Sequence, residues 1–493
     1  MKIQTNTNNM KLNSPISLFI LSISFAFMLS RCSVNTTEKE VQTNDPNIIV
    51  IFADDMGYGD MSINGHPTIK TPNLDKMATE GQKWTNFYAS SSVCTPSRAG
   101  LLTGRLPIRT GMCSSKRRVL FPDSSGGLPQ SEITIAKSLK QKDYATACIG
   151  KWHLGHLEGY QPLDHGFDYY FGIPYSNDMD RVEGVNAREV CMHPEVRYFN
   201  VPLIRNREVI ERPADQTAIT KRYTEEAVNF IRANQSKPFF IYLANSMPHV
   251  PLFASEDFEG KSMRGLYGDV IEEIDWSVGE IIKTLKEENL DKNTLVVFTS
   301  DNGPWLVFNE NGGSAGLLRE GKGTSYEGGM REPAIFWWPG KVQPGIITET
   351  GSTLDLFPTI NSIARIDIPK DRVYDGHDVS EVLFNHGKTN RESIFYYHGE
   401  EVFAVRSGNW KAHFKTQENI YTAKAEIVVH EPPMLFNLAT DPSEKYDLAS
   451  EYPEIIERLR KVVSQHVETI KPVENQLEKL IDPGQEGYEK KSL

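Results

Sequence analysis

The chain of 493 residues has few cysteines, no excess of positive charge and no internal repeat or low-complexity segment. Five cysteines exclude a scaffold held together by disulfides, although one disulfide bond is possible. A formal net charge of −12 argues against nucleic acid as a partner, because a phosphate backbone is bound through excess lysine and arginine. The remaining composition is that of a globular protein, and the length is sufficient for a large α/β enzyme.

The first thirty residues differ from the rest of the chain. Lys2 and Lys11 precede an apolar run over 16–29, which is short for a bilayer span but has the size of a signal-peptide core. Residues 1–32 are therefore expected to direct export, and the polar residues 33–45 to act as a tether. The residues up to Cys32 resemble a bacterial lipoprotein cleavage box, with Arg31 as a departure from it. We expect a bacterial protein in the periplasm or, with Cys32 lipidated, attached by lipid alone to the outer membrane or cell surface.

Apolar runs and helical spacings alternate along the middle of the chain. Buried parallel strands are predicted by continuous apolar runs at 47–52, 145–149, 238–244 and 294–299. Helices are predicted at 71–80, 131–142 with Ser131 as cap, 217–233, 267–288 and 353–364. This alternation predicts an α/β fold with a mostly parallel sheet sandwiched by helices. Residues 155–215 show no clear period and are expected to form a long ordered insertion bordering the site.

The character of the sequence changes after residue 364. Short strand-like pieces occur at 393–397, 402–406, 410–414, 426–429 and 434–438, and a helical segment follows at 453–470. This pattern predicts a smaller C-terminal domain made of an antiparallel sheet and one helix. The expected organisation is an N-terminal catalytic domain over 46–374, a C-terminal α+β subdomain over 375–480 and a tail over 481–493.

Polar side chains follow the ends of the predicted strands. The four groups are Asp54 with Asp55, Lys151 with His153, His249, and Asp301 with Asn302. Ligands bind at the carboxyl ends of strands in open α/β sheets, so these groups share one edge if the strands are neighbours. Two like charges about 4 Å apart repel each other by roughly 4 kcal/mol at an intermediate dielectric. Clustered carboxylates therefore favour the binding of a cation. An all-oxygen set suits calcium and could suit magnesium.

A second feature is Cys94, which stands just before a predicted helix with Thr95 as its cap. Unpaired N–H groups at a helix start favour an anion, and Arg98 and Arg105 add positive charge. A flexible glycine-rich loop around Lys322 is also suited to approach an anion. A nucleophile beside an anion cradle suggests attack on a charged ester. The alternative interpretation of Cys94 is a small buried apolar residue.

Several motifs together resemble the type I sulfatase family. They are Cys94 to Arg98 followed by Leu102 to Arg105, Phe52 to Asp60, Gly150 to Gly155, Phe298 to Pro304 and Gly321 to Arg331. The resemblance covers about residues 46–480. Within the family, the sequence is similar to both the arylsulfatase A and the N-acetylgalactosamine-6-sulfatase branches. It implies an alkaline-phosphatase-like fold and hydrolysis of a sulfate ester, either an aryl sulfate or a sulfated sugar such as galactose or N-acetylgalactosamine sulfate.

The resemblance also implies the roles of individual residues. Cys94 would be oxidised to formylglycine (3-oxoalanine) by a maturation enzyme, and its hydrate would attack sulfur. One calcium ion would be bound by Asp54, Asp55, Asp301, Asn302 and the modified Cys94. The other catalytic residues would be Arg98, Lys151, His153, His249 and Lys322. Sulfate would be contacted by Lys151, His249, Lys322 and Ser176.

Two other functions remain open at this point. One is a phosphate or phosphonate monoesterase of the alkaline phosphatase superfamily, although too few histidines accompany Asp301 for a site with two zinc ions. The other is an inactive, exported glycan-binding lipoprotein, which the presence of every expected catalytic residue type argues against. The oligomeric state is not indicated.

Overall fold

The computed structural model describes residues 45–418 and 425–482. The predicted signal peptide with Cys32, the tether up to residue 44 and the tail from residue 483 lie outside these ranges. Within them, no helix has both the length and the apolar character needed to cross a membrane.

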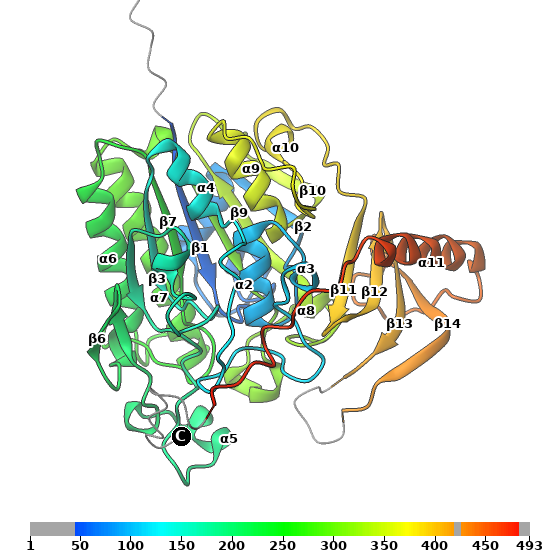
Figure 1. The fold of residues 1–493 in the computed structure, drawn as a ribbon, viewed down its shortest axis with the longest axis horizontal. Coiled ribbons are helices and arrows are strands. Elements are labelled where there is room, and N and C mark those ends of the chain that lie inside the picture. Colours follow the sequence, from blue (N-terminus) through cyan, green and yellow to red (C-terminus); the bar gives the residue numbers. More distant parts are fainter. Residues whose placement is uncertain (1–44, 419–424, 483–493) are drawn as a thin grey trace, which may run out of the picture. The chain divides into compact units, whose positions relative to one another are not determined.

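Among the described residues, ten strands form one sheet in the order β10-β2-β9-β8-β1-β7-β3-β4-β5-β6 (Figure 1). The strands are β1 (Asn47–Ala53), β2 (Gln82–Tyr88), β3 (Ala145–Gly150), β4 (Tyr169–Gly172), β5 (Leu203–Arg205), β6 (Glu208–Glu211), β7 (Phe239–Ala244), β8 (Thr294–Ser300), β9 (Arg331–Trp337) and β10 (Gly345–Ser352). The four predicted strands are neighbours and run parallel, in the order β8-β1-β7-β3. The outer parts are mixed, because β9 and β5 run antiparallel to their neighbours. The prediction of a mostly parallel sheet is confirmed.

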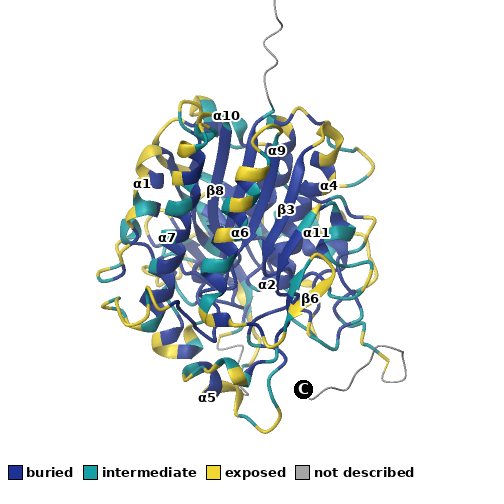
Figure 2. Ribbon diagram, turned by 90° about the vertical axis from the view of Figure 1, so that its left-hand side faces the viewer, coloured by how far each residue is buried: buried dark blue, intermediate teal, exposed yellow. Residues whose placement is uncertain are grey.

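Helices cover both faces of this sheet. On one face lie α1 (Pro72–Glu80), α6 (Ile219–Ala233) and α7 (Leu266–Glu287), and on the other α2 (Cys94–Thr103), α4 (Ile135–Leu139), α9 (Leu356–Ile363) and α10 (Ser380–Asn385). Strand β1 alternates between the faces, since Ile49 and Ile51 pack in the first cluster and Ile48 and Val50 in the second. Figure 2 shows β3 and β8 buried and the outward sides of α1 and α6 exposed. Full burial of each apolar side chain of β1 contributes about 1.5–3 kcal/mol to the stability of the fold.

Two helix starts differ from their predictions. Helix α4 begins at Ile135 rather than near 131, because the hydroxyl of Thr134, not Ser131, accepts the hydrogen bond from the Lys137 N–H at 3.0 Å. Helix α2 begins at Cys94 itself, with Val93 at the cap position. Thr95 is therefore not the cap; its hydroxyl donates to the His153 carbonyl at 3.0 Å.

The insertion over 155–215 is ordered, as predicted. It contributes β4, β5 and β6, which extend the large sheet, and α5 (Ala187–Met192). The remaining short α-helices of the described chain are α3 (Pro107–Thr110) and α8 (Glu327–Met330).

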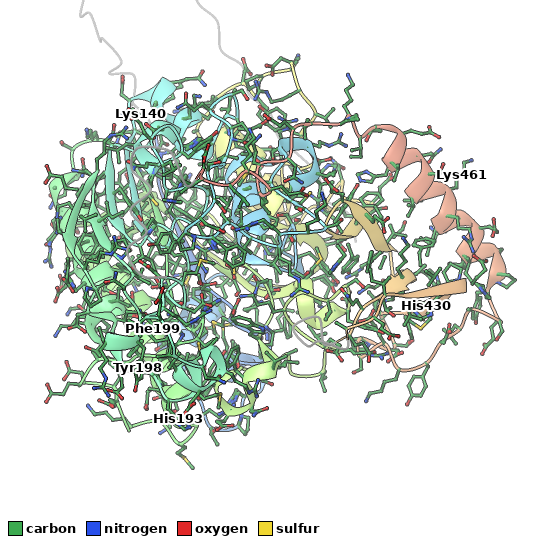
Figure 3. The ribbon with its side chains drawn as sticks, turned by 60° about the horizontal axis from the view of Figure 1, so that its bottom comes forward. Lys140, His193, Tyr198, Phe199, His430 and Lys461 are labelled. Atoms are coloured by element: carbon green, nitrogen blue, oxygen red, sulfur yellow. The ribbon has the colours of Figure 1, made fainter. Side chains whose placement is uncertain are left out.

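A separate antiparallel sheet forms the C-terminal part, in the order β11-β12-β13-β14. Its elements are β11 (Ser393–His398), β12 (Glu401–Ser407), β13 (Trp410–Thr416), β14 (Val428–Asn437) and the helix α11 (Pro453–Glu468). The helix packs on the sheet through Ile456 and Leu459, and Figure 3 labels Lys461 of α11 and His430 of β14 in this part. The sheet and helix are confirmed. The prediction of two strands at 426–429 and 434–438 is wrong, because one strand runs through the prolines between them.

The predicted boundary at residue 375 stays a prediction. Val379, Val382 and Leu383 pack in the core of the large sheet, so the chain leaves that core only after α10.

A buried charge cluster joins the two sheets. The Lys411 ammonium of β13 lies 3.0 Å from a carboxylate oxygen of Glu327 and 3.0 Å from one of Glu444, and all three side chains are fully buried. Tyr88 of β2 and Tyr396 of β11 each donate a hydrogen bond of 2.6 Å to Glu327. Removing one charge from such a cluster leaves the others buried and unpaired.

Lys411→Met is therefore expected to lower the free energy of unfolding by about 3–5 kcal/mol. Lys415→Met is the matched control, since Lys415 lies on the same strand and pairs with Glu401 at the surface, at 2.6 Å. The control should lose less than about 1 kcal/mol. Denaturant unfolding of the two variants measures the difference, and equal losses would contradict the assignment.

Candidate active site

The carboxyl ends of four neighbouring strands bring the predicted polar groups together. Asp54 and Asp55 follow β1, Lys151 and His153 follow β3, His249 lies beyond β7, and Asp301 and Asn302 follow β8. All seven side chains are buried. Asp55 and His153 have φ angles of 64° and 57°, in the left-handed region where side chains other than glycine are strained.

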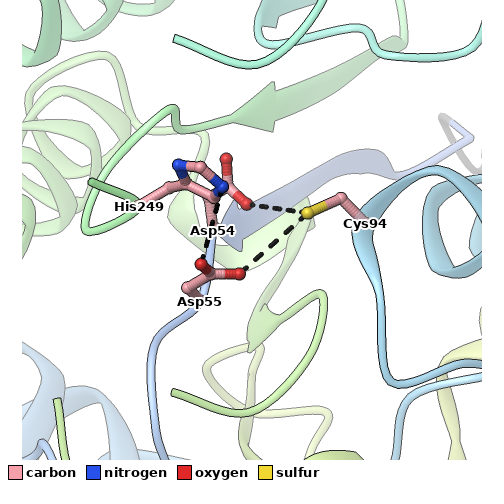
Figure 4. Close-up of side chains that lie close together, drawn as sticks. All are labelled: Asp54, Asp55, Cys94 and His249. Atoms are coloured by element: carbon pink, nitrogen blue, oxygen red, sulfur yellow. Dashed lines mark hydrogen bonds and ion pairs between the residues drawn. The ribbon is translucent and has the colours of Figure 1, made fainter. Parts of the chain in front are cut away.

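Cys94 lies at the first turn of α2 and points at this edge of the sheet (Figure 4). Its sulfur is 3.6 Å from Asp54 Oδ1, 4.0 Å from Asp55 Oδ1 and 3.2 Å from the Lys322 ammonium. Burial raises the pKa of the Cys94 thiol far above its usual value, more than Lys151 and Lys322 lower it. The unmodified thiol is therefore neutral, and a neutral thiol is a poor nucleophile.

Three carboxylates are matched by three cationic side chains. The Arg98 guanidinium donates twice to Asp301 Oδ2, at 2.8 and 3.0 Å. The Lys151 ammonium donates to Asp54 at 2.6 Å, and the Lys322 ammonium lies 2.6 Å from Asp55. Three negative and three positive formal charges cancel, so these side chains alone give the site no net attraction for an anion.

The carboxyl groups differ in their protonation. Although burial opposes ionisation, Lys151 and Arg98 hold the pKa of Asp54 well below its usual range. Burial raises the pKa of Asp55 to about 7, and Lys322 offsets only part of the rise. Burial and the charge of Asp54 also raise the pKa of Asp301. A further positive charge near Asp55 and Asp301 would favour their ionised forms.

The site fits a divalent cation. Ligand atoms of Asp54, Asp55, Cys94 and His249 all lie within 4.8 Å of one another. Asn302 lies beside them, where its Nδ2 donates to Asp55 Oδ1 at 2.7 Å and its buried Oδ1 has no hydrogen-bond partner within residues 45–418 and 425–482. Carboxylate and amide oxygens are the donors that calcium and magnesium prefer. Asp301 takes part less directly, because its oxygens accept from Arg98 and from the Asp55 N–H.

Two histidines line the site with defined proton positions. The His249 Nδ1 contacts the Val250 carbonyl, which only accepts, so Nδ1 carries the proton and Nε2 faces Ser176 at 3.3 Å. By the same reasoning His153 Nε2 donates to the Leu120 carbonyl at 2.8 Å, and its buried Nδ1 has no hydrogen-bond partner in the described part of the chain. Burial holds the pKa of both histidines well below its usual value. Ser176 also accepts from the Lys151 ammonium at 3.1 Å.

The site opens into a cavity of about 810 Å³. Cys94, His153, Ser176, His249 and Lys322 are among the residues that line it. Its volume lies at the upper end of the range of small-molecule pockets and exceeds the need of a bare sulfate group.

The predicted site residues come together at one edge of the sheet, apart from Arg105 and from Cys32, which lies outside the described ranges. Arg105 pairs with Glu132 at 2.6 Å instead of adding charge near Cys94. Trp305 was not predicted, although it also lines the cavity. Its position three residues after Asn302 is the sequence signal that would have indicated it.

Comparisons with known proteins agree with this geometry. Residues 46–366 match the family model described as Sulfatase, and residues 389–487 match the C-terminal region of aryl-sulfatase. Human arylsulfatase A is 41% identical over 447 residues, covering 85% of this chain and 87% of that protein. N-acetylgalactosamine-6-sulfatase of Canis lupus familiaris is 39% identical over 476 residues, covering 88% of each.

Solved structures show the same architecture. The PsFucS1 sulfatase from Pseudoalteromonas sp. superimposes with a TM-score of 0.79 at 29% identity, covering 88% of this chain and 92% of that one. A phosphonate monoester hydrolase of Agrobacterium radiobacter superimposes with a TM-score of 0.59 at 19% identity, covering 86% and 96%. The second likeness shows the fold alone, and the alternative of a phosphonate esterase gains no further support from it.

Proposed function

Since the chain belongs to the sulfatase family and hydrolyses sulfate esters, we propose that it removes sulfate from a sugar by means of a formylglycine formed from Cys94. The substrate class is a galactose or N-acetylgalactosamine sulfate within a glycan. One of its relatives is an N-acetylgalactosamine-6-sulfatase, and the cavity of about 810 Å³ has room for a sugar beyond the sulfate. Small aryl sulfates would then be artificial substrates.

The proposal rests on the position of the Cys94 sulfur, which lies between the Lys322 ammonium and two carboxylates. Burial raises the pKa of the thiol, so the thiol itself is unsuited to attack an anionic ester. A formylglycine hydrate would supply two hydroxyl groups on one carbon, one to attack sulfur and one to release sulfate afterwards. A maturation enzyme that oxidises Cys94 is part of the proposal.

The cationic side chains would bind the sulfate oxygens. Lys322 contacts the Cys94 sulfur, Lys151 contacts Asp54, and Ser176 lies between Lys151 and His249. Arg98 lies behind them and holds Asp301. Preorganised positive groups of this kind stabilise the charge that develops on the ester oxygens.

The histidines would move protons. His249 would protonate the departing alcohol with help from the Lys322 ammonium, since both lie near Asp55 on one side of the site. Its Nε2 would first take up a proton, which the negative charge of the bound ester favours. His153 Nδ1, which is buried and bonds to none of the residues that the structure describes, would accept the proton from the second hydroxyl.

The ion proposed for the site is one calcium ion held by Asp54, Asp55, Asp301, Asn302 and the modified Cys94. It would supply the positive charge that the balanced carboxylates and cations lack. Magnesium prefers the same oxygen donors, so the choice of calcium follows the family resemblance.

The route of the protein is proposed from its N-terminus. Residues 1–32 would direct export to the periplasm or cell surface, with Cys32 as the lipidated residue. The mature chain would consist of a catalytic domain over 46–374 and a C-terminal subdomain over 375–480.

A panel of position-defined sulfated monosaccharides, assayed for free sulfate, tests the substrate proposal. We expect turnover of galactose 6-sulfate or N-acetylgalactosamine 6-sulfate, with 4-nitrophenyl sulfate as the reference. Matched 4-nitrophenyl phosphate tests the phosphatase alternative, and preference for phosphate by orders of magnitude would overturn the proposal. Turnover of the aryl sulfate alone would contradict the sugar substrate but not the sulfatase chemistry.

A further inference from the structure

Trp305 contacts the two side chains proposed to protonate the departing alcohol. The Lys322 ammonium lies 4.4 Å from the centroid of the Trp305 ring. The His249 ring centroid lies 5.1 Å from it, with the two planes tilted by 51°. Trp305 also lines the cavity above Cys94, so its ring borders the space that the substrate enters.

An indole ring suits this place because it attracts a cation without accepting its proton. A cation over an aromatic face is attracted by the ring electrons, and tryptophan is the best of the aromatic residues for it. On its other sides Lys322 contacts the Cys94 sulfur at 3.2 Å and Asp55 at 2.6 Å. Trp305 therefore restrains the ammonium from a third direction, and it limits the rotation of the His249 ring by packing against it.

The Trp305 ring is itself held by Phe308. The two ring centroids are 4.7 Å apart with the planes at 74°, an edge-to-face arrangement. Both residues follow β8 on the same short segment that carries Asp301 and Asn302. One short segment after β8 thus carries both Asp301 and Asn302, which are proposed to bind the metal, and Trp305, which supports the two proposed proton donors.

We propose that Trp305 is a positioning residue that holds Lys322 and His249 on the side of the site from which the alcohol leaves. The inference rests on the proposed function, because it concerns protonation of the leaving group of a sulfate ester. It predicts that the need for Trp305 depends on how much the leaving group needs a proton, which a merely structural role would not produce.

Two aryl sulfates with the same shape at sulfur test this. The 4-nitrophenolate ion leaves readily without a proton, whereas phenolate is a poorer leaving group. Trp305→Leu should lower kcat for phenyl sulfate by about 10²-fold, the lower end of what general acid catalysis contributes. For 4-nitrophenyl sulfate kcat should fall less than about tenfold, and KM should change little for either ester.

Two further variants keep the test decisive. Trp305→Phe retains an aromatic face and should show the same selective loss to a smaller degree, even if the leucine variant does not fold. Phe308→Leu removes the ring that holds Trp305 and should show a weaker loss of the same selective kind. Equal losses on both esters in folded Trp305 variants, or losses confined to KM, would overturn the inference. A wild-type protein that releases sulfate neither from these esters nor from the sulfated sugars would instead refute the proposed function.

Discussion

Replacing Cys94 with alanine is expected to lower kcat by more than about 10⁴-fold in protein made by its native host. The side chain touches Lys322, Asp54 and Asp55, so its removal takes the reacting group from the centre of the charge cluster. Cys94→Ser should be inactive at steady state as well, because serine has no second hydroxyl on the attacking carbon. Free sulfate released from 4-nitrophenyl sulfate measures the loss.

Cys191→Ala is the control for this prediction. Cys191 is also an unpaired, buried cysteine, but it lies on α5 rather than at the site. This control should keep its activity, and thermal melting should show that both alanine variants fold. Retention of most activity by Cys94→Ala would contradict the assignment of residue 94.

Removal of divalent ions is expected to have the second largest effect. A chelator should lower sulfate release by more than about 10²-fold, because Asp54, Asp55 and Asp301 then balance Arg98, Lys151 and Lys322 and leave no net charge to attract the ester. Calcium added back should restore activity. It should also raise the melting temperature, since an ion at a hundred times its Kd stabilises the folded state by about 2.7 kcal/mol.

Asn302→Ala tests the same site without unpairing a buried charge. The Asn302 Oδ1 is buried and has no partner among the described residues, so the variant loses an oxygen that could bind the ion, together with the hydrogen bond that Nδ2 donates to Asp55. The variant should need more calcium for the same rise in melting temperature. A rise identical to that of the wild type would show that Asn302 does not bind the ion, and no rise in either protein would contradict the metal site.

The centre of the fold was predictable because its strands are marked locally. Strands β1, β3, β7 and β8 are continuous apolar runs, and they are buried throughout. The edges were not predictable in this way. Strand β10 is partly exposed and polar, and β9 carries Pro333 in its interior. Both are defined by pairing with β2, which is distant in sequence.

The site was predictable because chemistry-bearing residues follow those same buried strands. The sequence placed Asp54 and Asp301 at strand ends, and the order β8-β1-β7-β3 brings the ends together. Local reasoning failed where a tertiary contact takes over a side chain. Thr95 bonds to the His153 carbonyl instead of capping α2, and Arg105 pairs with Glu132. The contact of Trp305 with Lys322 likewise depends on segments that only the fold brings together.

The mass of the peptide that contains residue 94, taken from active protein made in its native host, tests the central claim most directly. We predict that Cys94 is replaced by an aldehyde-bearing residue, detected by its mass and by trapping with a hydrazine reagent, and that the modified fraction rises in proportion to activity. An unmodified thiol at position 94 in fully active protein would contradict the account.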